Sequence, residues 1–447
     1  MNSGADRQFP RLAEDVGVIL RRELPRAATL VVGLSGGIDS VVLLQVLMRR
    51  LRLAPARVSA IHVNHQLSPH AGRWVTFCRR LCRELGVKLH VAKVDVPRGN
   101  STEAAARAAR YAVFAGSKAD VLMLAHNRDD QAETVLLQLL RGAGPRGLAA
   151  MPVLRPGVSG GPAVLRPLLE MPRAAIEAYA ARHGLQWVED ESNQDRAYLR
   201  NFLRHDVLPL LESKLPGARG TLARAARHQA ECSELLDVLA AGDLGSAPHA
   251  GRLPLALLKG LTPSRARNAL RYFLRCNAIA MPEAERLQEL LRQANTARGD
   301  ARVCVDLGAA ELRRFQNTLY IVRPLPRLAK SFEVPWSGRG ALALPQLGGS
   351  LQLLRRKGEG IAARALRAAS LTVGVRRGGE TLRLDSGRPR RTVRNLLQEA
   401  ALPPWERQRL PFLYLGEDLA AVACLGVDAL FQARPGETGL LLVWTPD

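Results

Sequence analysis

Up to Leu140 the chain alternates short apolar runs of strand length with longer segments of helical period. Thr29–Leu34 is a continuous apolar run, and Val41–Leu51 behind it repeats its apolar residues at helical spacing. The same alternation predicts further strands at Val58–Val63, Val87–Val94 and Val121–Ala125, and helices at Ala71–Leu85, Thr102–Gly116 and Asp129–Leu140. Repeated β-α units form a parallel sheet that helices cover on both faces. We therefore predict an α/β fold whose ligands bind beyond the carboxyl ends of the strands.

The rest of the chain is predicted to form further units after a break at Pro216-Gly217. Helical segments at Pro172–His183 and Ala197–Leu211 precede the break, and an Ala- and Arg-rich helical region follows it and gives way to short strands. We expect an α/β domain at 1–215, a mostly helical domain at 216–325, a linker with some strand content at 326–370, and a small α+β domain at 371–447.

The amino-acid composition gives only weak evidence about function. The formal net charge of +23 points toward a polyanion such as nucleic acid. Only seven of the 64 cationic residues are lysines, and the accompanying richness in Ala, Leu and Gly is what a GC-rich genome produces anywhere. Charge is therefore informative only where it clusters. Aromatic residues make up 4% of the chain, which argues against a surface built mainly on base stacking.

Cysteine usage and hydropathy exclude several other classes. The six cysteines show no Cys-x-x-Cys spacing, so neither a disulfide framework nor a closed zinc site is expected. Cys78 and Cys82 lie one helical turn apart and are typical of small buried hydrophobes. The N-terminus lacks an apolar signal core, and no apolar stretch approaches the ~18 residues of a membrane span. We expect a cytoplasmic protein with no membrane contact.

The segment Ser35-Gly36-Gly37-Ile38-Asp39-Ser40 lies between a predicted buried strand and a predicted helix. Such a loop directs backbone N–H groups and a helix N-terminus at a bound anion, and the two serines add hydroxyl donors. No lysine follows the glycines, so this is not the loop that transfers a γ-phosphoryl group. The Asp39 carboxylate would repel phosphates unless Mg²⁺ lay between them, which predicts ATP with Mg²⁺. The loop resembles that of the N-type ATP pyrophosphatases, which activate a carbonyl oxygen with AMP and release pyrophosphate.

Two further segments are expected near this loop. The stretch His62–Ser68 follows the second strand, which makes His62 and Asn64 candidate ATP ligands, with a structural histidine pair as the alternative. Arg107 and Arg110 can share one helix face, where they would stabilise phosphate charge, with a solvated helix face as the alternative.

The stretch Ala125–Thr134 ends the fourth predicted strand and opens a helix. It brings the carboxylates of Asp129, Asp130 and Glu133 to the same rim as Asp39. Acidic capping of the helix start accounts for one carboxylate but not for Asp130 together with Glu133 one turn later.

At this point the motifs resemble, in order, those of the bacterial tRNA(Ile)-lysidine synthetase family. The matching stretches are HVNHQLS, AARAARY, AHNRDDQAET, RGAGPRGL, LRPLLEMPR, WVEDESNQD and YLRNFLR, and near the C-terminus VRRGGE and LPPWER. The motifs match closely up to about Leu211 and again after Leu371. The region between them matches the family only in its position and its helical character. Ala143 stands where serine is expected, away from the proposed chemistry.

The resemblance implies a reaction and its partners. The enzyme would join free L-lysine to C2 of the wobble cytidine in a CAU-anticodon isoleucine tRNA, after ATP has adenylylated the cytidine. It implies that Asp39, with Mg²⁺, and the loop hold ATP. Asp130 would be an essential carboxylate, as metal ligand or amine-orienting group, and Arg107 and Arg110 would act on phosphate charge.

The resemblance also implies two sets of substrate contacts. His126, Asp129 and Glu133 would line a lysine pocket, and Arg200, Asn201 and Arg204 would contact tRNA. It leaves open which residues bind the lysine carboxylate and whether the chain acts as a monomer or a homodimer.

An arginine cluster in the last domain predicts a second tRNA contact. From Arg376 to Arg394 seven arginines face two acidic residues, a local excess of +5. We expect this cluster to bind the tRNA backbone through Arg376, Arg377, Arg390, Arg391 and Arg394. The alternatives are a tRNA thiolase of the same superfamily, disfavoured by the missing Cys-x-x-Cys, and a non-catalytic tRNA-binding protein with a vestigial ATP site, disfavoured by the intact carboxylates.

Overall fold

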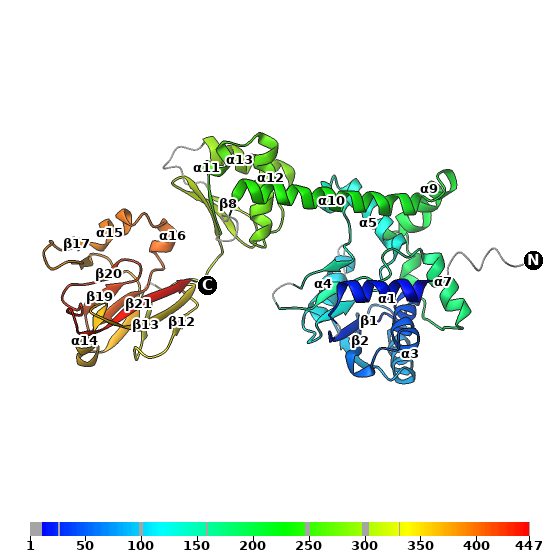
Figure 1. Ribbon diagram of the computed structural model, residues 1–447, viewed down its shortest axis with the longest axis horizontal. Helices are drawn as coiled ribbons and strands as arrows, with labels where there is room; N and C mark the ends of the chain where they lie inside the picture. The colour runs from blue at the N-terminus through cyan, green and yellow to red at the C-terminus, as the bar shows by residue number, and fades with distance from the viewer. Residues whose placement is uncertain are drawn as a thin grey trace, which may run out of the picture. The chain divides into compact units, whose positions relative to one another are not determined.

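The structure is a computed structural model that describes residues 11–25, 27–97, 102–157, 160–245, 251–296, 304–329 and 331–446. It divides into two compact units, residues 1–236 and residues 237–447, and we describe each by itself (Figure 1). Among the described helices none is both long and apolar enough to cross a membrane.

The first unit is built around one six-stranded sheet. Its strands are β1 (Leu30–Gly33), β2 (Val58–Asn64), β3 (Lys88–Lys93), β4 (Val121–Met123), β5 (Leu154–Arg155) and β6 (Ala163–Leu165). Its helices are α1 (Leu12–Glu23), α2 (Ile38–Gln45), α3 (Ala71–Glu84), α4 (Thr102–Ala115), α5 (Arg128–Leu140), α6 (Pro145–Leu148), α7 (Arg173–Arg182), α8 (Leu199–Phe202), α9 (Leu208–Lys214) and the start of α10 (Ala218–Leu244). Two π-helical turns, Val46–Arg50 and Leu203–Val207, extend α2 and join α8 to α9, and 3₁₀ turns lie at Pro55–Arg57 and Glu191–Gln194.

The strand order β3-β2-β1-β4-β6-β5 explains where the site lies. All neighbouring strands pair in parallel except β5, which runs antiparallel to β6. The chain leaves β1 toward β2 and β3 and then returns to β4 on the other side, so the order reverses between β1 and β4. Loops that follow these two strands open a crevice at the carboxyl edge of the sheet, where α/β proteins bind ligands.

Helices cover both faces of this sheet, as the sequence pattern predicts. One face packs against α1, α2, α3 and α7 through residues such as Leu43, Leu81 and Ile176. The other face packs against α4 through Phe114 and Tyr111, which contact a core of Val31, Leu122 and Val164. Cys78 and Cys82 are buried in the first core, as expected for small hydrophobes.

The second unit contains one helix-backed sheet and two further sheets. The first sheet has the order β7 (Arg252–Pro254), β10 (Thr318–Val322), β9 (Glu311–Phe315), β8 (Cys304–Asp306) and packs with α11 (Ala256–Lys259), α12 (Pro263–Cys276) and α13 (Ala284–Thr296). The next has the order β11 (Glu333–Pro335), β15 (Leu371–Gly374), β18 (Phe412–Leu415), β19 (Asp418–Val422), β20 (Gly426–Val427). The last has the order β12 (Leu342–Leu344), β13 (Gly349–Lys357), β21 (Thr438–Pro446), β14 (Ile361–Ala362). The short pair β16 (Thr381–Leu382) and β17 (Arg391–Thr392), with α14 (Ala363–Ala368), α15 (Val393–Glu399) and α16 (Pro404–Arg407), completes the unit.

The segment expected as a linker, 326–370, contributes more structure than its sequence suggested. β11 pairs with β15, and β13 pairs along its whole length with β21, from Gly349 opposite Pro446 to Lys357 opposite Thr438. These partners lie far away in the sequence, so the local pattern could not reveal them.

Candidate active site at the carboxyl edge of the sheet

The loop Ser35–Ser40 joins the buried strand β1 to α2, as predicted. Gly36 has a φ of +93°, and a Cβ added there would lie 2.7 Å from Val188 Cγ2, so both conformation and space require glycine. Ser40 Oγ accepts from the Gly36 N–H at 3.2 Å and donates to Gly37 O at 2.9 Å, and Ser35 Oγ accepts from the Gly37 N–H. These bonds fix the loop in a tight turn at the N-terminus of α2, the geometry that favours a bound phosphate.

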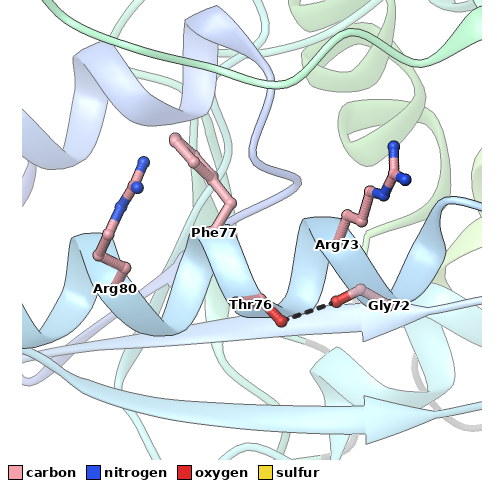
Figure 2. A pocket seen from close by; sticks show the side chains of 5 residues that line it. All are labelled: Gly72, Arg73, Thr76, Phe77 and Arg80. Carbon is pink, nitrogen blue, oxygen red and sulfur yellow. Dashed lines mark hydrogen bonds between the residues drawn. The ribbon is translucent and has the colours of Figure 1, made fainter.

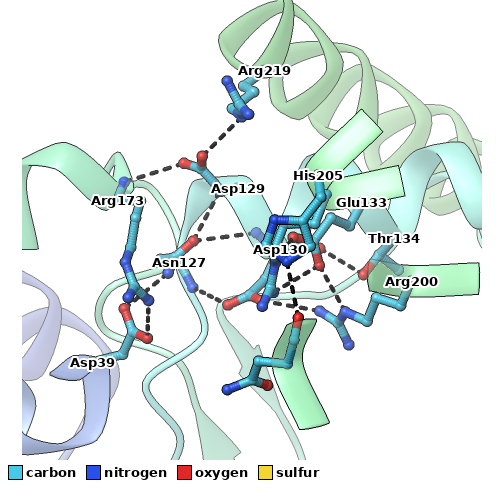
Figure 3. Close-up of polar contacts among 12 residues, drawn as sticks. Asp39, Asn127, Asp129, Asp130, Glu133, Thr134, Arg173, Arg200, His205 and Arg219 are labelled. Carbon is cyan, nitrogen blue, oxygen red and sulfur yellow. Dashed lines mark hydrogen bonds and ion pairs between the residues drawn. The ribbon is translucent and has the colours of Figure 1, made fainter. Parts of the chain in front are cut away.

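Asp39 points from this loop to two partners on other elements (Figure 3). Asn127 Nδ2 donates to Asp39 Oδ1 at 3.0 Å, and Arg173 Nη1 lies 2.5 Å from Asp39 Oδ2. Burial raises the pKa of Asp39, and the nearby Asp130 adds to the rise, although Arg173 and Asn127 act against it. A buried carboxylate in this state favours additional positive charge beside it.

Asn127 connects Asp39 to the carboxylates of α5. Its side-chain oxygen accepts from the backbone N–H groups of Asp129 and Asp130, and the Asp130 side chain accepts in return from the Asn127 N–H at 3.0 Å. This capping box fixes the start of α5 and the direction of the Asp130 side chain. Neither Asn127 nor Arg173 was among the predicted site residues, although both lie in the motifs AHNRDDQAET and LRPLLEMPR.

Asp130 and Glu133 form a buried four-charge cluster with two arginines of the segment from α8 to α9. Arg200 reaches Glu133 Oε2 at 2.7 Å and Asp130 Oδ1 at 3.1 Å. Arg204 reaches Glu133 Oε1 at 2.5 Å and Asp130 Oδ1 at 3.0 Å. Burial favours a higher pKa for Asp130, but its cationic neighbours, Arg200 first, lower the pKa overall. Asp130 is therefore ionised, and both carboxylates are paired with cations inside the protein.

The residues of this segment that were predicted to contact tRNA form hydrogen bonds and ion pairs within the protein. Arg200 and Arg204 hold the carboxylates of α5, and the Asn201 amide donates to the backbone oxygens of Ser192 and Asp195 at 2.9 and 2.8 Å. Their contact with tRNA stays a prediction, because the structure shows only their intramolecular partners.

His126 and Asp129 lie on either side of this helix start. Burial lowers the pKa of His126 to about 4, with Arg166 and Arg200 adding to the fall and Asp130 opposing it. Its Nδ1 atom is buried, and none of the described residues forms a hydrogen bond with it. Asp129 accepts from the Arg173 backbone N–H at 3.1 Å and lies 2.9 Å from the Arg219 guanidinium. Asp129 therefore orients the start of α7, from which Arg173 reaches Asp39.

The candidate ATP ligands at the end of β2 have structural partners. His62 Nδ1 donates to Leu34 O at 2.8 Å, and burial lowers its pKa, so the ring is neutral and supports the strand that leads into the loop. Asn64 Oδ1 accepts from the Gln66 N–H at 2.8 Å. Asn64 also lines a hollow with Ser68, Val75 and Lys93 at the carboxyl ends of β2 and β3.

A second hollow lies on α3, lined by Gly72, Arg73, Thr76, Phe77 and Arg80 (Figure 2). The Arg80 guanidinium lies 5.7 Å from the centre of the Phe77 ring, and Thr76 Oγ1 donates to Gly72 O. Phe77 also packs close to Gly36, because a Cβ there would lie 3.6 Å from the ring. We assign no ligand to this hollow.

Arg107 and Arg110, predicted to act together, have different neighbours. Arg110 lies near His65, whose pKa falls through burial and then through this cation. Arg107 lies over the Tyr111 ring, 5.1 Å from its centre, and near His126. The cations with the largest effect on the pKa of Asp39 are instead Arg173 and Arg204.

Three family models match the chain. A model described as PP-loop domain covers residues 2–211, one described as TilS substrate binding domain covers 253–320, and one described as TilS substrate C-terminal domain covers 371–444. The tRNA(Ile)-lysidine synthase of Nitrosomonas europaea is 42% identical over 96% of this chain and 94% of its own. That of Chromobacterium violaceum is 43% identical over 93% of this chain and 95% of its own. The chain belongs to the tRNA(Ile)-lysidine synthase family.

Membership confirms the family predicted from the motifs and the α/β fold predicted from the alternating strands and helices. The PP-loop match confirms that the chain has an ATP-binding domain of this kind. Among solved structures, the U34-tRNA thiolase NcsA from Methanococcus maripaludis with its [4Fe-4S] cluster aligns with 49% of this chain and 79% of its own. Its sequence identity is 20% and the TM-score is 0.43, a likeness too low to bear on the activity.

The C-terminal arginines of this lysidine synthase family member differ in how far they are engaged. Arg377 pairs with Glu333 at 2.5 Å, Arg391 pairs with Glu399, and Arg376 lies 3.8 Å from Glu380. Arg390 lies 3.1 Å from the fully buried Asp428 and also bonds Thr381. Arg394 is exposed and has no carboxylate partner among the described residues. Most of the predicted tRNA-binding arginines therefore also stabilise their own domain.

Proposed function

We propose that this chain joins L-lysine to C2 of the wobble cytidine in a CAU-anticodon isoleucine tRNA. ATP first converts the cytidine O2 into an AMP ester, with release of pyrophosphate, and the lysine amine then displaces AMP. The observation that carries the proposal is that relatives named tRNA(Ile)-lysidine synthase match nearly the full chain. The intact phosphate loop and carboxylates of the site support it. The reaction changes the codon and amino-acid identity of the tRNA from methionine to isoleucine.

The first step needs the loop and Asp39. The cytidine O2 atom attacks the α-phosphorus, the O2–P bond forms, and the bond from that phosphorus to the bridging oxygen breaks. The N–H groups of the loop and the N-terminus of α2 hold the phosphates, and the negative charge of the departing pyrophosphate increases as it leaves. Arg173, already beside Asp39, is a further cation at this point of the site.

Asp39 fits a Mg²⁺ site better than Asp130 does. Asp39 has a raised pKa and, among the described residues, forms an ion pair with Arg173 alone, so added positive charge there offsets its burial. Both oxygens of Asp130 are engaged, one by Arg200 and Arg204 and the other by the Asn127 N–H. Mg²⁺ commonly takes one or two protein carboxylates and completes its shell with phosphates and water. When bound, the ion would neutralise phosphate charge during transfer to the cytidine.

We assign the second step to the charge cluster on α5. Lysine arrives as an ammonium, which seeks a carboxylate, yet Asp130 and Glu133 are already neutralised. An ammonium that replaced Arg204 at Asp130 would keep the cluster neutral, and Arg204 is the more exposed of the two arginines, at 36% against 24% for Arg200. Arg200 would then remain beside the ammonium and lower its pKa, which favours transfer of its proton to solvent water before the amine attacks.

His126 is suited to accept a proton in a later step of the reaction. Once the amine has bonded to C2, its nitrogen is a far stronger acid, so even a weak base accepts the proton. The neutral His126 imidazole has a free Nδ1 atom beside Asp130, which is where this proton would be released.

The proposed function is tested by mass spectrometry of nucleosides from the tRNA after incubation with the enzyme, ATP, Mg²⁺ and isotope-labelled lysine. We expect labelled lysidine and one AMP for each molecule formed. Folded protein that yields no labelled nucleoside, or that yields ADP and orthophosphate, would contradict the assignment.

A further inference from the structure

Three arginines surround Tyr111 at the edge of the sheet where β4 and β6 end. The Arg107 guanidinium on α4 lies 5.1 Å from the centre of the Tyr111 ring, and that of Arg155 on β5 lies 5.6 Å from it. Arg166, the residue after β6, interacts with the Tyr111 side chain. A guanidinium stacked on an aromatic ring keeps its N–H edges free and held in direction.

These three cations differ from the arginines that hold Asp130 and Glu133, because they have no such acid partners. Among the described residues, no carboxylate forms an ion pair with Arg107, Arg155 or Arg166. Arg200 and Arg204, by contrast, each reach two carboxylates. The sequence shows the same bias, since between Glu133 and Glu170 it contains four arginines and no acidic residue.

Arg166 gives this cluster its strongest feature. The residue is 3% exposed, and its Nη1 donates to Pro152 O at 2.8 Å. Its buried Nε finds no hydrogen-bond partner in the part of the chain that the structure describes. Burial lowers its pKa, Tyr111 acts against the fall, and repulsion from Arg155 and Arg107 adds to it. A buried cation held among other cations is costly unless an anion compensates it. The cluster is therefore suited to an anion that the described residues do not supply.

We propose that Arg107, Arg155 and Arg166 bind a phosphate of the RNA backbone beside the nucleotide that reacts. The inference rests on the proposed function for the identity of the RNA. Arginine forks match phosphate oxygens in pairs, and RNA loops present phosphates next to unstacked bases.

The fold separates this cluster from the loop that holds ATP. The loop leads into α2, which packs on one face of the sheet, whereas Tyr111 belongs to α4 on the other face. Arg107 and Arg166 are instead among the charges that act on His126, which follows β4. A backbone phosphate at the cluster would thus place the adjoining nucleotide near His126 and Asp130.

The test compares Arg155→Gln and the double variant Arg107→Gln/Arg155→Gln with Arg141→Gln as a matched control. Arg141 lies in the same acid-free stretch and is exposed, but it follows the far end of α5, roughly 20 Å along the helix from the site. Binding of the full-length tRNA is measured over a range of salt concentrations, and ATP binding is measured in parallel. We expect Arg155→Gln to weaken tRNA binding roughly tenfold, the double variant to weaken it further, and the salt slope to fall by about 0.7 per lost contact.

The possible results distinguish a phosphate of the tRNA backbone from a phosphate of ATP as the bound group. Weaker tRNA binding with unchanged ATP binding supports the proposal, provided that Arg141→Gln behaves as wild type. Weaker ATP binding with unchanged tRNA binding would assign the cluster to ATP and overturn it, and so would no change in either. Failure of the proposed function is distinguishable, because wild-type protein would then form no lysidine, whereas the binding comparison between variants does not depend on turnover.

Discussion

Asn127 Nδ2 donates a hydrogen bond to Asp39 Oδ1 at 3.0 Å, and the two residues are 88 positions apart in the sequence. The contact exists because β1 and β4 are neighbours at the point where the strand order reverses, so the loops that follow them meet. Asn127 caps α5 with its oxygen and binds Asp39 with its nitrogen. One amide therefore links the phosphate loop to the helix that carries Asp130 and Glu133.

The substitution Asn127→Ser separates these two roles. Serine caps a helix about as well as asparagine, so the unfolding midpoint in urea should stay close to that of the wild type. Serine cannot reach Asp39 with an amide N–H, so the carboxylate loses a donor and its position. We expect pyrophosphate release in the presence of tRNA to fall at least tenfold. Equal activity in Asn127→Ser would show that the Asn127–Asp39 bond has no part in catalysis.

Asp39→Asn provides the direct test of the loop. The amide has nearly the same shape but no charge, so Arg173 loses its ion-pair partner and a metal loses its ligand. Turnover should fall by several orders of magnitude while the fold persists, which circular dichroism and tRNA binding can verify. Retention of near-wild-type turnover would remove Asp39 from the mechanism.

Removing one charge from the buried cluster on α5 should lower the free energy of unfolding by a large amount. Glu133 is fully buried and receives hydrogen bonds from both Arg200 and Arg204. Glu133→Gln leaves two guanidinium groups with one carboxylate between them, and breaking a buried pair typically costs ~3–5 kcal/mol. Urea unfolding should reveal this loss. The matched control is Glu84→Gln, which removes the exposed Arg80–Glu84 pair and should cost less than ~1 kcal/mol.

The sequence predicted the scaffold of this site better than its contacts. The apolar run before Ser35 and the helical spacing after it were sufficient to place the loop at a strand–helix junction, because local pattern determines these elements. Arg200 and Arg204 illustrate what local pattern omits. Each was predicted to bind tRNA, yet each pairs with Glu133, which lies 67 and 71 positions away. Arginine suits a phosphate and a carboxylate equally, so only the packing of α5 against the segment from α8 to α9 decides the partner.

Asn127 and Arg173 were overlooked for a related reason. Asn127 looked like one polar residue in an acidic stretch, although its position just before the predicted helix marks it as a cap. Arg173 follows Pro172 at the start of α7, and nothing in the local sequence indicates that it faces Asp39. Likewise, the strand β13 resembled a linker because its partner β21 lies at the other end of the domain.

His126 predicts how stability depends on pH. Its pKa is about 4 in the folded protein and about 6.5 when unfolded, so the unfolded chain binds an extra proton between these values. The stabilisation is therefore complete above about pH 6.5 and is lost as the pH falls toward 4, by up to about 3 kcal/mol. Asp130, whose pKa is lowered in the fold, changes stability in the same direction.

The measurement is the urea midpoint between pH 7 and pH 4.5 for wild type and His126→Gln. Wild type should lose stability steeply as the pH falls, whereas His126→Gln should show a shallower slope. One buried imidazole is then removed, while His62, His65 and the carboxylates still titrate. Parallel slopes for the two proteins would mean that His126 titrates normally in the folded state.

The structure shows which C-terminal arginine should be substituted to test tRNA binding, which the sequence alone does not show. Arg390 neutralises Asp428, which is fully buried, so Arg390→Glu would place two carboxylates together inside the domain. Loss of tRNA binding in that variant would therefore reflect damage to the fold as much as a lost contact. Arg394 is exposed on α15 and has no carboxylate partner among the described residues, so its charge is available to a ligand.

We therefore predict that Arg394→Glu weakens tRNA binding roughly tenfold, leaves ATP binding intact and leaves the unfolding midpoint unchanged. Arg390→Glu should lower the midpoint whether or not it alters tRNA binding. The control is Arg434→Glu, an exposed position in the same unit outside the cluster. If Arg394→Glu binds tRNA as the wild type does at moderate salt, the arginine cluster serves the stability of its own domain and the tRNA contact must lie elsewhere.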